Sequence, residues 1–205
     1  MSTRLILVCS TVLWFCAVAY GISVMWRYEN TPGVAAAPPV SWPTGTRIQR
    51  STENPTLIMF AHPHCPCTRA SIGELSAIMA HSQGRLNAYV LFLRPAGFTD
   101  NWEKTDTWKS SASIPGVTPL IDYDGNEAHQ FHAATSGQTL LYDESGRLLF
   151  SGGITGSRGH SGDNAGRSSI TTLLNNGAAD RTETFVFGCP LFDESSACRE
   201  NTVKR

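Results

Sequence analysis

TLIMFAHPHCPCTRA, residues 56–70, joins a short apolar run to two cysteines that stand one residue apart. The apolar run, residues 56–61, predicts a buried strand. Cys65 and Cys67 follow it, and a segment with helical periodicity begins at Thr68. At the start of a helix, unpaired N–H groups and the helix dipole favour a thiolate over a thiol. These residues therefore indicate a site for thiol chemistry.

The Cys-Pro-Cys sequence supports two kinds of chemistry. Pro66 suits the first helical position, because the proline ring fixes φ and the N–H that it lacks would be unpaired there. Cys65 then lies nearest the helix cap, so we assign it as a nucleophile and Cys67 as the resolving thiol. Thiolate and imidazole together also suit a soft metal. The alternative is therefore a copper site formed by Cys65, Cys67 and His64.

Length and charge restrict the class of protein. The 205 residues, of which 41% are hydrophobic, suffice for one domain with its own core. The formal net charge of −1 gives no reason to expect nucleic acid as a partner.

An uncharged segment of membrane length occupies residues 5–26, between Arg4 and Arg27. Residues 17–19 resemble a signal-peptide cleavage site, but the apolar run continues beyond them. We therefore predict that residues 1–27 form an uncleaved transmembrane signal anchor rather than a cleaved signal peptide. One anchor after a short tail places the domain outside the cytoplasm. This predicts a single-pass protein of the inner membrane with a periplasmic domain, where disulfides are stable.

Residues 28–51 hold four prolines and an Ala-Ala-Ala run, with no amphipathic period. This composition favours extended, semi-rigid chain. We therefore expect a linker that holds a domain of residues 52–205, including a C-terminal extension, away from the membrane.

The hydrophobic pattern after the linker alternates between strand and helix. The predicted strands are 56–61, 87–93, 117–122, 139–142 and 147–151. The predicted helices are 68–81, 102–113 and 127–133, and a last one that Asp163 or Asn164 caps and that ends at Leu174. This order predicts an α/β domain, a mixed sheet with helices on both faces.

The order of elements, with cysteines at the start of the first domain helix, resembles the thioredoxin-like superfamily from about residue 54 to 174. The HCPC sequence of residues 64–67, TSGQTLLYD of residues 135–143 and the glycine-rich loop 152–164 are similar to bacterial membrane-anchored thioredoxin-like proteins labelled RedB. The resemblance implies a thioredoxin-like mixed β-sheet with flanking helices, preceded by one N-terminal transmembrane helix. It lends a fold more than an activity.

The sequence departs from thioredoxins in two ways. It has Cys-x-Cys in place of Cys-x-x-Cys, and Gln138 stands after Gly137 where thioredoxins carry a cis-proline. That proline docks the substrate backbone and keeps metal from the thiols, so its absence leaves an SCO-like copper chaperone as an alternative. SCO-like proteins place a histidine ligand near residues 129–132. Here the hairpin alignment puts Thr135 at that place, so we expect His129 and His132 to be solvated.

Several residues are predicted to flank the thiols. His62 and His64 precede them, and imidazole can lower the pKa of a thiol or bind metal. In a thioredoxin-like sheet the first hairpin strand runs antiparallel to the cysteine-bearing strand, so residues 136–138 and the glycine-rich loop should border Cys65. Arg158 and His160 on that loop are candidates to stabilise a thiolate or bind an anionic group.

Cys189 and Cys198 lie nine positions apart near the C-terminus. In an oxidising compartment they most simply form a structural disulfide. The alternative is a relay in which they exchange electrons with Cys65 and Cys67.

We therefore predict a membrane-anchored, extracytoplasmic thiol–disulfide oxidoreductase that uses Cys65 and Cys67 without a cofactor. Its partner would be a protein disulfide or dithiol. The alternatives are the SCO-like copper metallochaperone, a thiol peroxidase, which the thiol pair fits poorly, and a non-catalytic interaction domain.

Overall fold

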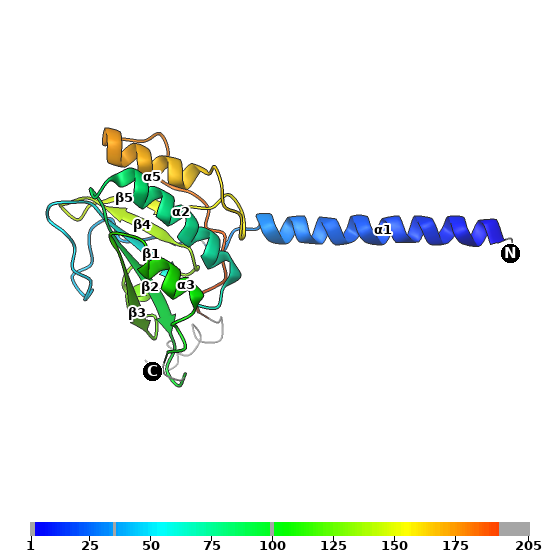
Figure 1. Cartoon of the computed structure of the whole chain (residues 1–205), viewed down its shortest axis with the longest axis horizontal. Coiled ribbons are helices and arrows are strands. Elements are labelled where there is room, and N and C mark those ends of the chain that lie inside the picture. The colour runs from blue at the N-terminus through cyan, green and yellow to red at the C-terminus, as the bar shows by residue number, and fades with distance from the viewer. Residues whose placement is uncertain (1–2, 35, 99–100, 193–205) are drawn as a thin grey trace, which may run out of the picture. The chain divides into compact units, whose positions relative to one another are not determined.

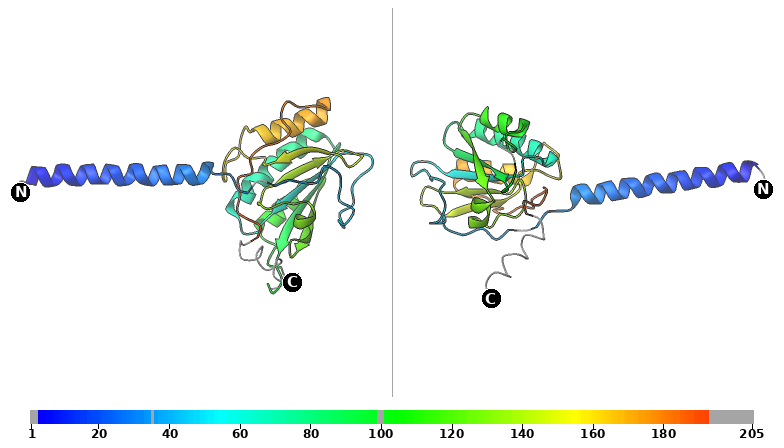
Figure 2. Two further views of the ribbon diagram at one scale, coloured as in Figure 1. Left: turned by 180° about the vertical axis from the view of Figure 1, so that it is seen from behind. Right: turned by 90° about the horizontal axis from the view of Figure 1, so that it is seen from below.

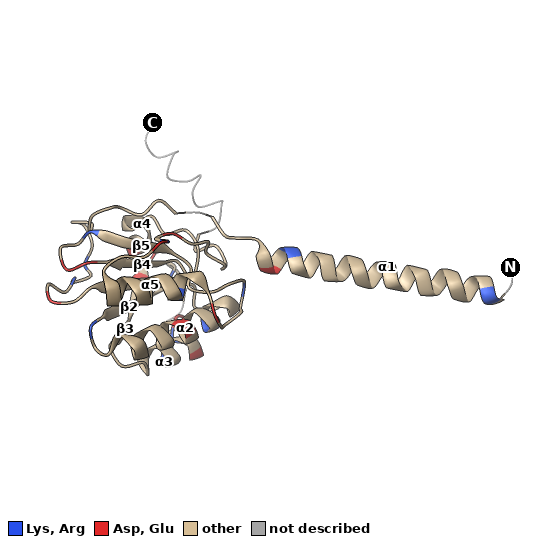
Figure 3. Cartoon of the chain, turned by 90° about the horizontal axis from the view of Figure 1, so that it is seen from above, with Lys and Arg blue, Asp and Glu red and all other residues tan. Residues whose placement is uncertain are grey.

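A computed structural model describes residues 3–34, 36–98 and 101–192, and divides the chain into two compact units at Thr31 and Pro32. The first unit is α1 (Thr3–Asn30), a helix of 28 residues. Figure 3 shows charged residues only near its two ends. At 1.5 Å per residue it is about 42 Å long, more than the ~30 Å of a bilayer core. This helix is long and apolar enough to cross a membrane.

The second unit is built on a five-stranded mixed sheet in the order β3-β2-β1-β4-β5 (Figure 1). Its strands are β1 (Thr56–Ala61), β2 (Asn87–Arg94), β3 (Val117–Tyr123), β4 (Thr139–Tyr142) and β5 (Leu148–Gly152). The first three are parallel, β4 runs antiparallel to β1, and β5 runs antiparallel to β4. The C-terminal end of β1 and the beginning of β4 therefore lie next to each other, at the same end of the sheet.

Helices cover both faces of this sheet (Figures 1 and 2). They are α2 (Pro66–Ser82), α3 (Asp106–Ala112), α4 (Asn126–Gln130) and α5 (Ala165–Asn176). Side chains alternate along β1, so its residues face two different core clusters. Leu57, Met59 and Ala61 belong to a cluster with apolar residues of α2 and α5, and Ile58 and Phe60 belong to one that includes Ala128 of α4. This is the predicted thioredoxin-like α/β fold.

The predicted elements are confirmed, with two shorter helices. The helix predicted at residues 102–113 begins at Asp106, because Asn101 adopts a φ of 69° and residues 101–103 form a turn. The helix predicted at 127–133 ends at Gln130, and His132 has a φ of 54°. At the last helix the side chain of Asn164, rather than Asp163, accepts the capping hydrogen bond from the Arg167 N–H.

Residues 32–51, most of the segment that we expected to be a linker, belong to the second compact unit and pack within it. The carbonyl of Val40 accepts a hydrogen bond from the N–H of Leu148 on the edge strand β5, at 2.9 Å. Trp42 packs edge-on against two aromatic rings of the core, and Ile48 is buried. Around Ser41 this chain forms an antiparallel bridge to Arg147 beside the edge strand β5, so it covers an edge of the sheet.

Candidate functional site

The site is built around the first turn of α2. Cys65 is the N-cap residue, with extended φ and ψ of −80° and 121°, and Pro66 occupies the start of the helix. This confirms the predicted position of Cys65 at the cap. Its N–H donates to the carbonyl of His62 at 3.1 Å, and its own carbonyl accepts from Thr68 at 3.1 Å. Cys65 is 3% exposed and Cys67 is 7% exposed.

A third thiol lies in this site. The Sγ atom of Cys189 is 2.8 Å from the Sγ atom of Cys65, although 124 positions separate the two residues along the chain. Cys65, Cys67 and Cys189 are all free thiols. The structure therefore brings three cysteines together, whereas the sequence motif contains two.

The pKa of Cys65 lies below its ordinary value. Burial acts to raise it, but hydrogen bonds from the thiol and the backbone N–H of Cys189 act in the opposite direction. The N–H groups of Cys67 and Thr68, in the first turn of α2, add to this effect. The hydrogen bonds prevail, so Cys65 is the thiol of this site that most readily becomes a thiolate.

The other two thiols hold their protons more firmly. Burial raises the pKa of Cys67, and the neighbouring Cys65 adds to this through its charge and a hydrogen bond. Burial together with Cys65 raises the pKa of Cys189 to about 12. The Arg158 guanidinium acts against both shifts. One low-pKa thiol beside two protonated thiols is an arrangement suited to thiol–disulfide exchange.

The sheet edge before β4 borders the thiols as predicted. The Ser136 hydroxyl accepts a hydrogen bond from the N–H of His62 at 2.9 Å and lies 3.0 Å from the hydroxyl of Thr68. The N–H of Gly137 donates to the carbonyl of Phe60 at the end of β1, at 2.7 Å. These contacts fix the loop that carries Cys65 against the start of β4. The roles of Ser136 and Thr68 have no signature in the sequence.

The glycine-rich loop contributes Arg158 but not His160. Arg158 interacts with Cys67 and donates a hydrogen bond to the carbonyl of Gly188, next to Cys189. His160 is exposed, and its Nδ1 donates to the carbonyl of Arg158 at 2.9 Å. The buried carboxylate of Glu74 on α2 holds the loop through the N–H of Gly162 at 2.7 Å and the side chain of Asn164 at 3.1 Å.

The histidines of the HPHCPC sequence lie toward an aromatic side chain. The Nε2 atom of His64 donates to the carbonyl of Trp102 at 3.1 Å, and the two rings are 4.6 Å apart. His62 accepts a hydrogen bond from the N–H of His64 at 3.2 Å and packs edge-on against Trp102. His129 and His132 do not take part in these contacts. His129 stacks on Phe192, and His132 donates a hydrogen bond to the carbonyl of Ala37.

These positions do not favour the copper alternative. Across residues 3–34, 36–98 and 101–192, no group of three or more His, Cys, Asp or Glu side chains is arranged to hold a metal ion. His64, the predicted third ligand, is already engaged with Trp102. The structure therefore does not favour a copper site formed by Cys65, Cys67 and His64.

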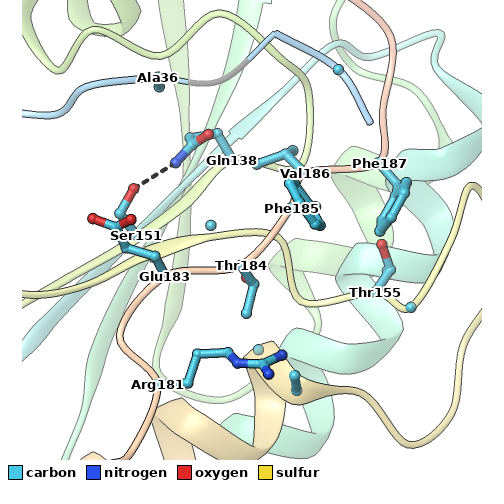
Figure 4. A pocket seen from close by; sticks show the side chains of 15 residues that line it. Ala36, Gln138, Ser151, Thr155, Arg181, Glu183, Thr184, Phe185, Val186 and Phe187 are labelled. Carbon is cyan, nitrogen blue, oxygen red and sulfur yellow. Dashed lines mark hydrogen bonds between the residues drawn. The ribbon is translucent and has the colours of Figure 1, made fainter. Parts of the chain in front are cut away.

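Gln138 faces a cavity rather than the thiols. Its backbone carbonyl accepts from the N–H of Phe60 at 2.9 Å, but its Nε2 donates to the Ser151 hydroxyl at 3.0 Å (Figure 4). The side chain lines a cavity of about 580 Å³ between the β4–β5 hairpin and residues 181–187. The substitution of glutamine for the thioredoxin proline thus directs a polar side chain away from the sulfur atoms.

Cys189 lies beside Cys65, a position that among the expectations from the sequence only the relay alternative connected with the thiol pair. The predicted disulfide between Cys189 and Cys198 involves a residue outside the described part of the chain, so it stays a prediction. The neighbouring Gly188 is the residue that marks the close packing of this segment. A Cβ atom added there would overlap the Ser136 carbonyl oxygen, so only glycine allows this close approach.

Comparison with known proteins supports the fold. No protein-family model and no curated protein sequence matches the chain. A hypothetical protein of Sinorhizobium meliloti shares 21% identity at a TM-score of 0.57, over 78% of this chain and 93% of that one. An uncharacterized conserved protein of Geobacillus kaustophilus shares 17% identity at a TM-score of 0.55, over 81% of this chain and 95% of that one. A secreted Mycobacterium tuberculosis disulfide oxidoreductase homologous to DsbE of E. coli is more distant. It shares 14% identity at a TM-score of 0.42, over 60% of this chain and 81% of that one.

The chain has the thioredoxin-like fold, with its cysteines at the N-terminus of the first helix after β1. At these sequence identities the two similarities with TM-scores above 0.5 support the fold and leave the activity to be argued from the site. The narrower resemblance to RedB-like proteins stays a prediction.

Proposed function

We propose that the protein is a membrane-anchored thiol–disulfide oxidoreductase whose domain acts in the periplasm on protein disulfides or dithiols. The observation that carries the proposal is Cys65, a thiol at a helix N-cap with a pKa below its ordinary value. The proposed reaction needs no cofactor, because the site thiols themselves carry the two electrons.

In the proposed reaction the Cys65 thiolate attacks a disulfide of the partner and forms a mixed disulfide. The outgoing sulfur of the partner leaves as a thiolate and takes a proton. A second thiol must then attack Cys65 to release the partner. Cys67, the predicted resolving thiol, and Cys189 both lie close enough to Cys65 to influence its charge.

The proposed location is supported by α1 and by the thiols. α1 is apolar enough to span a bilayer, and a redox-active thiol pair can cycle through a stable disulfide in an oxidising compartment. Labelling of intact cells with a membrane-impermeant maleimide tests this. After treatment with a membrane-impermeant reductant, which opens any disulfide at the site, Cys65 should react without cell lysis, whereas reaction only after lysis would place the domain in the cytoplasm.

The test of the activity is reduction of insulin disulfides by the full-length protein in detergent, with dithiothreitol as the electron donor. Cys65→Ser should reduce turnover to the uncatalysed rate, because a hydroxyl does not form the mixed disulfide. Cys9→Ser, which replaces a thiol within α1, is the matched control and should keep the full rate. Full turnover by Cys65→Ser would refute the proposed function.

A further inference from the structure

Cys189 is positioned by the backbone around it. Its carbonyl accepts from the N–H of Ser136 at 2.8 Å, and the N–H of Leu191 donates to the carbonyl of Ala134 at 2.9 Å. Thr135 and Pro190 form an antiparallel bridge between these two hydrogen bonds. The segment of residues 188–191 is therefore paired, strand-like, with the residues that lead into β4.

Two further contacts hold the same segment. Arg158 of the glycine-rich loop donates to the carbonyl of Gly188, and the side chain of Leu191 is buried in the core cluster on the α4 face of the sheet. The lack of a side chain at Gly188 lets the chain pass close to the Ser136 carbonyl. Backbone pairing with residues 134–136 and the buried side chain of Leu191 thus hold Cys189 in place, with its thiol directed at Cys65.

The two candidate resolving thiols differ in what they require. A Cys65–Cys67 disulfide must close within three consecutive residues, one of which is Pro66 with its fixed φ. A Cys65–Cys189 disulfide joins two segments that are already side by side, with sulfur atoms 2.8 Å apart. It leaves the first turn of α2 unchanged.

We propose that Cys189 is the resolving thiol of this site and that the redox-active disulfide joins Cys65 to Cys189. The inference rests on the proposed function, in which Cys65 is the nucleophile. It assigns Cys189 to the reaction instead of to a structural bond with Cys198.

The resolving step releases the partner from Cys65. The Cys189 sulfur attacks Cys65 Sγ in the mixed disulfide, a Cys65–Cys189 bond forms, and the bond between Cys65 and the partner breaks. The electron pair of the broken bond leaves on the partner sulfur, which takes the proton that Cys189 gives up. Cys65 and Cys189 are oxidised by two electrons in total, and the partner disulfide is reduced to two thiols. A protein dithiol then reduces the Cys65–Cys189 disulfide and restores the site.

The test uses the full-length protein in detergent, with glutathione disulfide as the probe. A Cys67→Ser/Cys198→Ser variant keeps only Cys65 and Cys189 in the domain. After brief oxidation, acid quenching and alkylation, non-reducing peptide mapping should recover Cys65 cross-linked to Cys189. Glutathione that persists on Cys65 while Cys189 is alkylated as a free thiol would overturn the assignment.

The matched variant is Cys189→Ser/Cys198→Ser, which keeps Cys65 and Cys67. Its glutathione adduct on Cys65 should persist on the order of tenfold longer than in the Cys67→Ser/Cys198→Ser variant. Equal lifetimes would show that Cys67 resolves as well as Cys189 and would contradict the proposal. In the wild-type protein the same oxidation should yield the Cys65–Cys189 peptide, and a Cys189–Cys198 peptide in its place would also contradict it.

A third variant separates this proposal from the proposed function. With Cys67, Cys189 and Cys198 all replaced by serine, Cys65 is the sole thiol of the domain and should retain glutathione stably. If no adduct forms there, although circular dichroism shows a folded domain, Cys65 is not the nucleophile and the proposed function fails. If the adduct forms but Cys189 never joins Cys65 in the other variants, the assignment of Cys189 alone fails.

Discussion

Cys65 and Cys189 meet sulfur to sulfur, but different parts of the molecule hold them in place. Cys65 is placed by its immediate neighbours, since β1 ends at Ala61 and α2 begins at Pro66. Cys189 is placed by backbone pairing with residues 134–136, remote in the sequence. Of the four hydrogen bonds that lower the pKa of Cys65, two come from the first turn of α2 and two from Cys189. The reactivity of the thiolate therefore depends on a local helix start and on a distant segment together.

Displacing the distant segment as a whole should have the largest effect. In Gly188→Ala the new Cβ would overlap the Ser136 carbonyl oxygen, so the backbone of residues 188–191 must move away. We expect the yield of the Cys65–Cys189 disulfide to fall severalfold, and the free energy of unfolding to fall by about 1–3 kcal/mol. Peptide mapping after oxidation and denaturant unfolding measure the two effects.

Gly156→Ala is the control for this substitution. Gly156 belongs to the same glycine-rich loop as Arg158, and a Cβ atom there meets nothing within 4 Å. It should leave both the disulfide yield and the stability unchanged. Equal behaviour of the two alanine variants would show that the close approach at Gly188 does not position Cys189.

The same division separates what the sequence could predict from what it could not. The apolar run of β1, Pro66 after the cap cysteine and the capping Asn164 are local signals, and each element they predict is confirmed. By contrast, residues 36–48 and Cys189 are positioned by hydrogen bonds to backbone groups of the sheet that are remote in the sequence and come together only in the folded domain. Proline content predicts extended chain but not the surface that it covers, and a cysteine pattern does not specify which thiols meet.

Removing the Cys189 thiol alone should have an intermediate effect. Alkylation proceeds through the thiolate, so the rate at Cys65 rises with pH through its pKa, which lies below the ordinary value. Cys189→Ala removes the side-chain hydrogen bond but keeps the backbone one, so this pKa should rise and alkylation below it should slow severalfold. Cys189→Ser keeps a hydrogen-bond donor and should lie between wild type and Cys189→Ala. A pH profile of iodoacetamide labelling, read at the Cys65 peptide, checks this, and identical profiles for all three would show that the first turn of α2 suffices.

The smallest effect should follow from Arg158→Gln, which acts on the two thiols that stay protonated. The guanidinium lowers the pKa of Cys67 and of Cys189, but burial, the larger influence, keeps both above their ordinary values. Its loss should raise both pKa values further and slow alkylation of Cys67 at alkaline pH, with little change at Cys65. Arg147→Gln, which breaks a surface pair with Asp143 on the hairpin turn, is the matched control and should alter neither thiol. If Arg158→Gln slows alkylation more at Cys65 than at Cys67, then Arg158 acts by holding Gly188, and hence Cys189, in place. The comparison of Arg158→Gln with Gly188→Ala would then decide how much the formation of the Cys65 thiolate depends on that segment.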